Sequence, residues 1–314
     1  MKKRLQGGSM SERFVQQVEP EEVFAALADE TRLAILQTLW ESEVETVSFS
    51  ALRRAVGMRD PGQFNYHLGK LAGRFVTRTA EGYRLTQAGK HVNGAIASGM
   101  YTAQGAIDPI VVDHSCRISG ESLLLLYENE TVRIECDTCS SCPSGWEAPV
   151  PPAVFAGYDR NEIPAVVSQY LRTISQHAIN GFCPYCNGWM EPTVRASDAM
   201  DVNPESSDER SEMPDDRLRD QPEVRFDCQR CGAEAKLALD HALLLGDPAV
   251  VSFHHENGII VREQPIWEFS ELSPENVEIE RRNPIRVGVT FGIDESAITV
   301  IVDEALNTET ANTL

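Results

Sequence analysis

The chain has 314 residues, 42% of them hydrophobic, which is enough to build a core in each of two or three domains. No stretch reaches the ~18 apolar residues that a membrane helix needs, and no apolar segment follows the basic start, so we expect no membrane anchor, no signal peptide and a cytoplasmic protein. Asp and Glu number 48 against 28 Lys and Arg, a formal net charge of −20, which repels polyphosphates unless positive charge is gathered at one place.

Lysine is scarce in this acidic chain. Only five lysines occur, so almost all of its positive charge is arginine. Excess carboxylate with little lysine is typical of halophilic proteins, and an ordinary acidic cytosolic protein is the alternative. High salt weakens the electrostatic part of nucleic-acid binding, so base contacts and dimerisation would then matter more.

The first elements are helices. Residues 1–18 are expected to be a flexible leader. Between residues 19 and 40, apolar residues recur every three or four positions, as on one face of a helix, and Asp29 can cap a second helix within this stretch. The pattern therefore predicts two consecutive helices.

Two shorter helices and a hairpin are predicted next. Ser48 can cap the first of these helices and Asp60 the second, and Gly57 suits a left-handed turn between them. Strand-like alternation surrounds residues 80–82, and one more helix follows. This order is that of a winged helix-turn-helix, so we expect residues 19–98 to form such a domain.

Positive charge is concentrated in the same region. From residue 48 to residue 90 the chain has eight basic residues and only two acidic ones. An acidic chain can bind a polyphosphate only where positive charge is concentrated, and this stretch has such an excess. The domain is therefore expected to bind double-stranded DNA. The residues predicted to face DNA lie on the two helices, in the turn and on the hairpin: Arg53, Arg54, Arg59, Gln63, Asn65, Tyr66, His67, Lys70, Arg78 and Arg84.

The residues of the second helix have specific expected roles. Gln63 and Asn65 carry amides that can pair with adenine in the major groove. The hairpin arginines, Arg78 and Arg84, would contact the DNA backbone or the minor groove. The arginines before the turn, Arg53 and Arg54, would bind DNA phosphates. For Tyr66 and His67, packing against the neighbouring helix is the alternative.

Three segments resemble ArsR-like winged-helix repressors, especially their archaeal members: LADETRLAIL at 27–36, FNYHLGKL at 64–71 and YRLTQAG at 83–89. The chain also resembles regulators of salt-loving archaea that carry a cysteine-bearing C-terminal region. The resemblance implies a winged helix that regulates transcription. The family's thiolate metal-sensing motif is absent, because no cysteine precedes Cys116, so heavy-metal sensing by this domain is not expected.

Residues 108–314 are expected to form a cysteine-rich α+β region with antiparallel strands, for regulation or dimerisation. An insert at about 197–222 is rich in Asp, Glu, Ser and Pro, which predicts disorder. Residues 149–152 predict a stiff linker, and the last ten residues a frayed end. Helices are predicted at 162–179 and 247–256, and strands within 122–135 and at 267–269, 277–281, 285–291 and 297–302.

All eight cysteines lie in this second region, and four of them form two Cys-x-x-Cys pairs. Two intervening residues let one tight turn direct both sulfurs at one ion, and two such turns complete the tetrahedron of structural Zn²⁺. Cys183, Cys186, Cys228 and Cys231 are therefore the predicted zinc ligands.

Other chemistry remains open for these cysteines. Cys183-Pro184-Tyr185-Cys186 is similar to a glutaredoxin redox motif, but here it follows a predicted helix instead of a strand. A disulfide scaffold is disfavoured in the cytoplasm, and an iron–sulfur cluster uses the same ligands.

Cys116, Cys136, Cys139 and Cys142 form a second possible zinc site, although Cys116 is not followed by a second cysteine at Cys-x-x-Cys spacing. Buried free thiols, or redox or metal sensing, are the alternatives for these four residues.

Taken together, these features predict a homodimeric transcription regulator with an unknown effector. No phosphate loop, nucleophile elbow, His-Glu-x-x-His motif or dinucleotide fingerprint occurs, so an enzyme is not expected. A thiol oxidoreductase or other enzyme with an accessory winged helix, and a protein–protein scaffold, are the alternatives.

Overall fold

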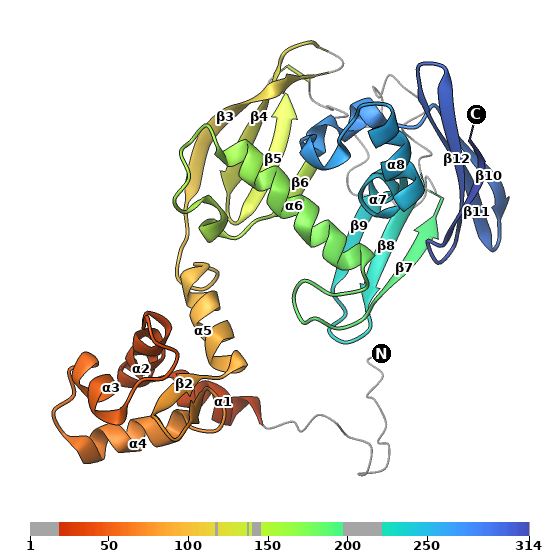
Figure 1. Cartoon of the computed structure of the whole chain (residues 1–314). Helices are drawn as coiled ribbons and strands as arrows, with labels where there is room; N and C mark the ends of the chain where they lie inside the picture. Colours follow the sequence, from red (N-terminus) through yellow and green to blue (C-terminus); the bar gives the residue numbers. More distant parts are fainter. Residues whose placement is uncertain (1–18, 117–118, 137, 140–145, 197–221, 314) are drawn as a thin grey trace, which may run out of the picture. The chain divides into compact units, whose positions relative to one another are not determined.

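The computed structural model describes residues 19–116, 119–136, 138–139, 146–196 and 222–313, which belong to two compact units, Met1–Thr102 and Ala103–Leu314 (Figure 1). The expected leader and nearly all of the acidic insert lie outside the described residues. The described part is α+β with antiparallel sheets, as predicted. None of its helices is both long and apolar enough to cross a membrane.

The N-terminal unit contains the predicted helices and hairpin, and its helices begin where the capping residues indicate. The side chains of Asp29, Ser48, Asp60 and Thr86 each accept a hydrogen bond from a backbone N–H in the first turn of the helix that follows. Gly57, at a φ of 77°, lies in the turn between α3 and α4. The elements are α1 (Pro20–Leu27), α2 (Glu30–Trp40), α3 (Phe49–Ala55), α4 (Pro61–Leu71), β1 (Val76–Arg78), β2 (Tyr83–Leu85) and α5 (Gln87–Ala97).

This unit has a core of its own. Leu36, Leu52, Phe64 and Leu68 are buried together, so α2, α3 and α4 pack on one another. The hairpin is fixed to this core through Gly82: a Cβ there would lie 2.2 Å from the Val47 carbonyl oxygen, so only glycine allows this close approach. The hairpin is therefore held against the segment that leads into α3, where Val47 also forms a bridge with Tyr83.

The C-terminal unit begins with an antiparallel four-stranded sheet and a helix that covers it. Ile163, Val167 and Leu171 of the helix pack into the core of this sheet. The helix confirms the prediction for residues 162–179. These elements are β3 (Ala106–Ser115), β4 (Ser122–Glu128), β5 (Thr131–Cys136), β6 (Trp146–Pro149) and α6 (Ile163–Ile179).

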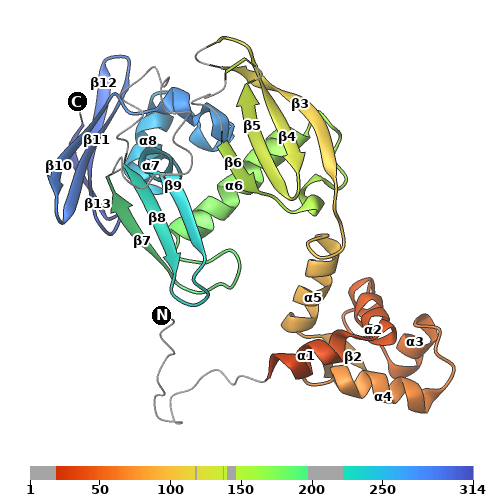
Figure 2. The same ribbon diagram turned by 180° about the vertical axis from the view of Figure 1, so that it is seen from behind.

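Two further antiparallel sheets share one core with two helices. Phe226, Leu243, Val250 and Val289 belong to this core, and both views show α7 and α8 beside the strands of both sheets (Figures 1 and 2). The elements are β7 (Met190–Arg195), β8 (Glu223–Cys228), β9 (Glu234–Ala238), α7 (Leu239–Gly246), α8 (Pro248–Glu256), β10 (Asn276–Arg282), β11 (Ile285–Ile293), β12 (Ser296–Asp303) and β13 (Thr308–Thr313).

Three sequence predictions in this unit are wrong. Residues 149–152 are no linker: Val150 is fully buried and donates a backbone hydrogen bond to Glu130, and a 3-10 helix follows at Pro152–Phe155. The stretch 267–269 is part of a 3-10 helix, Ile266–Leu272, in which Trp267 and Phe269 are buried. The last ten residues were expected to be frayed, but Thr308–Thr313 form β13, which pairs with β12 although its polar sequence gives no strand signal.

Candidate functional site

The outward face of α4 is polar. Gln63, Asn65, Tyr66 and Lys70 are exposed, while the apolar residues of the helix face the core. The Lys70 ammonium lies 5.5 Å from the centroid of the Tyr66 ring, a cation–π contact that leaves both groups at the surface. His67 differs: only 12% of its side chain is exposed, and its Nδ1 lies 3.2 Å from Asp29 Oδ1. His67 therefore links α4 to the start of α2. This contact agrees with the alternative prediction that His67 packs against a neighbouring helix instead of contacting DNA.

The candidate arginines divide into two groups. Arg53 donates from its guanidinium to the carbonyl oxygens of Met58 and Arg59, at 2.9 and 2.5 Å, so it holds the turn before α4. Arg84 forms an ion pair with Glu45 at 3.1 Å.

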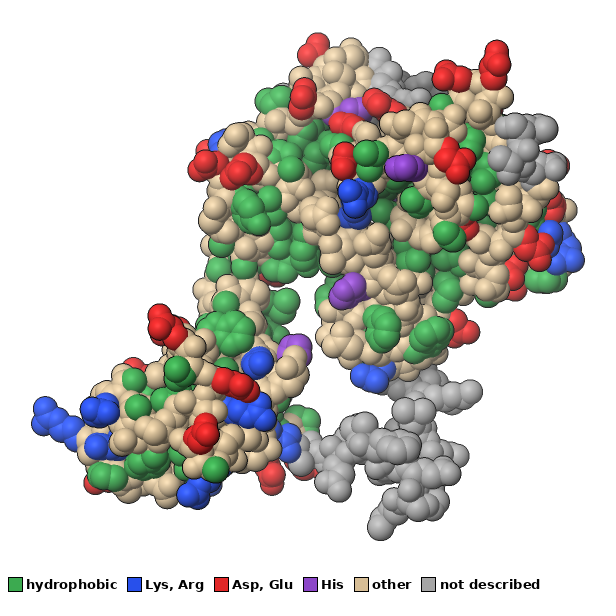
Figure 3. All heavy atoms as spheres, viewed as in Figure 1, with side chains coloured by type: hydrophobic (Ala, Val, Ile, Leu, Met, Phe, Trp, Pro, Cys, Tyr) green, Lys and Arg blue, Asp and Glu red, His purple; other side chains and the backbone are tan. Residues whose placement is uncertain are grey.

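The remaining candidate arginines, Arg54, Arg59 and Arg78, are exposed and form no ion pair among the described residues. The same holds for Arg74 and Lys90, which the sequence analysis counted as charges but did not assign to the contact. On the face shown in Figure 3, Lys and Arg side chains are frequent on the N-terminal unit, whereas Asp and Glu predominate on the C-terminal unit. The unpaired cations are thus available for an anionic partner.

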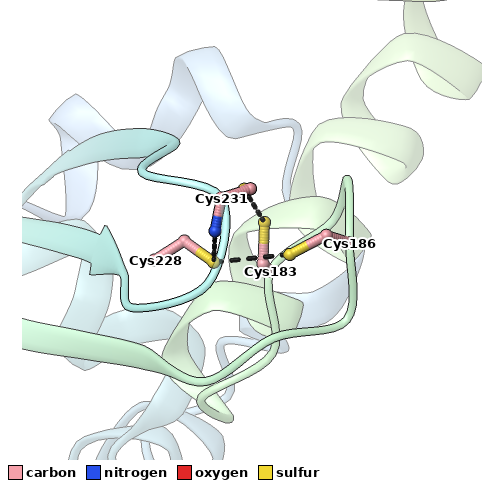
Figure 4. A group of neighbouring side chains, drawn as sticks. All are labelled: Cys183, Cys186, Cys228 and Cys231. Atoms are coloured by element: carbon pink, nitrogen blue, oxygen red, sulfur yellow. Dashed lines mark hydrogen bonds between the residues drawn. The ribbon is translucent and has the colours of Figure 1, made fainter. Parts of the chain in front are cut away.

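In the C-terminal unit, the structure brings the sulfurs of Cys183, Cys186, Cys228 and Cys231 within 4.8 Å of one another (Figure 4). Cys183 Sγ lies 3.8 Å from Cys231 Sγ, and Cys186 Sγ lies 3.4 Å from Cys228 Sγ. Four sulfurs at about 2.3 Å from one ion would be about 3.8 Å apart on a tetrahedron, so the spacing fits a single metal ion.

Each pair lies in a tight turn, one before β7 and one between β8 and β9. Asn187 and Gly232, which directly follow the second cysteine of each turn, have φ values of 53° and 75°. A side chain at Gly188 would crowd the site, because a Cβ there would lie 2.7 Å from Arg230 Cβ and 3.0 Å from Cys186 Sγ. These backbone features aim all four sulfurs at one point.

Backbone N–H groups stabilise thiolate in this cluster. The N–H groups of Cys231 and Arg230 lower the pKa of Cys228 to about 6, whereas burial raises the pKa of Cys186 to about 12. Thiolate is the form that binds a metal ion, so the hydrogen bonds that lower the pKa of Cys228 also favour metal binding.

The geometry separates the alternatives for these cysteines. Sulfurs 3.4 Å apart are not bonded, because a disulfide has an S–S length of about 2.05 Å. A four-iron cluster takes one thiolate on each iron, which would spread the sulfurs more widely than this. A redox motif needs an accessible attacking thiol, and Cys183 is fully buried after helix α6. The donor set thus fits one soft, tetrahedral cation.

A second cluster contains Cys116, Cys136 and Cys139, whose sulfurs also lie within 4.8 Å of one another. Cys116 Sγ lies 3.6 Å from Cys139 Sγ, and Cys136 Sγ lies 3.2 Å from the hydroxyl oxygen of Ser119, which the sequence analysis did not single out. Cys142, the fourth expected member, lies outside the described residues. Both clusters can hold a metal ion.

Residues 113–308 match the family described as Domain of unknown function (DUF7351), which covers more than half of the chain. The chain belongs to the DUF7351 family. Residues 20–96 match a second family, described as Domain of unknown function (DUF7347), and this segment contains every candidate DNA-facing residue. Comparison with curated proteins found no match, and comparison with solved structures found none.

The DUF7351 segment also contains a cavity of about 620 Å³ beside the turn that carries Cys183 and Cys186. Tyr185, from the turn between Cys183 and Cys186, lines it together with Phe226, His241 and Trp267. Its size falls in the range of small-molecule sites, and its lining is mainly apolar with a few polar groups.

Proposed function

We propose that the chain is a DNA-binding transcription regulator in which residues 19–98 act as an ArsR-like winged helix-turn-helix. In this proposal α4 enters the major groove and the β1–β2 hairpin is the wing. The order of α3, a tight turn, α4 and a two-stranded hairpin supports it.

The surface of α4 is the observation that carries the proposal. Two amides, a lysine and a tyrosine are exposed on one helix, and these are groups that read base edges and phosphates. Arg59, which lies just before α4, and Arg78, at the end of β1, are exposed and have no ion pair within the described part of the chain. In a chain of net charge −20, such a site favours a polyanion over an acidic protein partner.

For the C-terminal region we propose structural zinc in the four-cysteine cluster. Zinc would link the turn before β7 to the turn between β8 and β9, and would contribute folding free energy. The same region would serve dimerisation on a two-fold operator or sense an effector, for which the cavity beside Tyr185 has a suitable size. A cytoplasmic, salt-adapted setting completes the proposal.

The test is binding of the full-length chain to fluorescent genomic fragments at several salt concentrations. Wild type is expected to bind, with log K falling linearly as log salt rises. The double variant Arg59→Ala, Arg78→Ala should bind more weakly, with a slope shallower by about 2, since each lost phosphate contact removes about 1.

Arg282→Ala is the matched control, because Arg282 is exposed on β10 in the other unit. It should change neither affinity nor slope. If wild type binds DNA at none of the salt concentrations, or if the control variant loses as much affinity as the double variant, the DNA-binding proposal is refuted. Thiol reductase activity that Cys183→Ser abolishes would instead support the oxidoreductase alternative.

A further inference from the structure

The two cysteine clusters are built from a segment that occurs twice in the chain. The sequence VRIECDTC at residues 132–139 is repeated as VRFDCQRC at residues 224–231. In both copies a strand, β5 or β8, leads into the Cys-x-x-Cys pair. The two clusters can therefore be compared position by position.

The preceding strands also correspond. Leu123 of β4 pairs with Cys136, as Met190 of β7 pairs with Cys228. Leu123 lies seven positions after Cys116, and Met190 lies seven positions after Cys183. Cys116 is thus the counterpart of Cys183, which makes Ser119 the counterpart of Cys186.

Backbone hydrogen bonds support this alignment. The Cys183 N–H donates to Gly188 O at 2.9 Å, and the Cys116 N–H donates to Glu121 O, also five residues on, at 2.7 Å. Asn187 and Gly120, each four residues after the first cysteine of its turn, donate back to that cysteine's carbonyl oxygen, and both have positive φ. The two turns have the same hydrogen-bonding pattern.

The side chain of Ser119 lies where the Cys186 thiol would be. The Gly188 N–H donates to Cys186 Sγ at 3.3 Å, and the Glu121 N–H donates to Ser119 Oγ at 3.3 Å. Cys186 Sγ lies 3.4 Å from Cys228 Sγ, and Ser119 Oγ lies 3.2 Å from Cys136 Sγ. A hydroxyl therefore occupies the fourth corner of the second cluster.

We propose that Cys116, Cys136 and Cys139 form a second zinc site with Ser119 at its fourth corner, and that this site exchanges its ion faster than the four-cysteine site. A neutral hydroxyl is a weaker ligand than a thiolate, and three firm protein ligands leave the fourth position open to water or another ligand. The inference rests on the proposed assignment of zinc to the four-cysteine cluster.

The experiment follows zinc release from the reduced, zinc-loaded full-length chain into excess chromogenic chelator. Wild type should release two ions per chain in two phases of equal amplitude, one fast and one slow. Ser119→Cys restores four thiolates and should convert the fast phase into a slow one. Cys186→Ser makes the first cluster resemble the second and should make both phases fast. Ser252→Cys, an exposed position on α8, should leave the wild-type pattern unchanged.

The outcomes separate this inference from the zinc assignment itself. A wild type that holds one slowly released ion overturns the second site but leaves the four-cysteine site standing. A wild type without zinc overturns both. Cys142 has its own variant: if Cys142→Ala abolishes the fast phase while Ser119→Ala leaves it unchanged, the fourth ligand is not Ser119 and the proposal fails.

Discussion

Gly188 shows how one backbone position decides the geometry of the four-cysteine cluster. Its missing side chain lets Arg230 and two cysteine sulfurs approach closely, and a Cβ would lie 2.7 Å from Arg230 Cβ. Its N–H also donates to Cys186 Sγ. The ligands alone do not define this site, because the turn that carries them must be unhindered as well.

Gly188→Ala should therefore weaken zinc binding without removing a ligand. The added methyl group must displace the turn or a sulfur, so we expect faster zinc release and a lower Tm than in wild type. Gly105→Ala is the control, because a Cβ at Gly105 has no atom within 4 Å. Zinc content after dialysis against a chelator, measured together with Tm, gives the comparison. Equal zinc retention in both variants would show that the turn has room to adjust.

The sequence predicts the first residue of a helix best, because the capping interaction that determines it joins residues close together in the sequence. Asp60 followed by Pro61 marks the beginning of α4, and in the structure Asp60 Oδ1 accepts a hydrogen bond from the Gln63 N–H at 2.8 Å. One side chain and one backbone group, three positions apart, determine this feature. No distant contact is needed to define it.

Elements that depend on distant partners are harder to predict. Helix α7 was missed because it is buried nearly all round, so its sequence has no amphipathic period. Strand β13 pairs through its backbone and gives little apolar signal. In the metal clusters, Cys-x-x-Cys spacing predicted the ligands of the first site. The role of Ser119 emerges only when the repeated segment is aligned with the register of its strands.

The capping bond of α4 provides a test at this scale. Asp60→Ala removes the acceptor and should destabilise the helix by about 0.5–2 kcal/mol, which corresponds to amide exchange in α4 faster by roughly 2- to 30-fold. Asp60→Asn is the matched variant, since Asn caps as well as Asp, and should retain most of the protection. Hydrogen exchange of peptides that cover α4 would show this. Unchanged exchange in Asp60→Ala would mean that packing of Phe64 and Leu68 alone fixes the helix.

At the scale of the whole molecule, the two units have separate cores. The buried cluster of the N-terminal unit contains only residues of that unit, and both cysteine clusters lie in the other unit. Charge is divided as well, because the stretch 48–90 carries a positive excess within an acidic chain. Stability that depends on metal should therefore belong to one unit, and DNA contact to the other.

Removal of zinc should consequently affect one unfolding transition and not the other. A chelator is expected to lower the Tm of the C-terminal unit, because its metal-linked turns lose free energy of folding that binding supplies. The transition of the N-terminal unit should remain unchanged, which calorimetry combined with hydrogen exchange can assign. In the double variant Cys183→Ser, Cys228→Ser the chelator should lower the Tm less, because this variant has already lost the four-cysteine zinc site. If both transitions shift together in wild type, the units are coupled, and zinc stabilises the N-terminal unit as well.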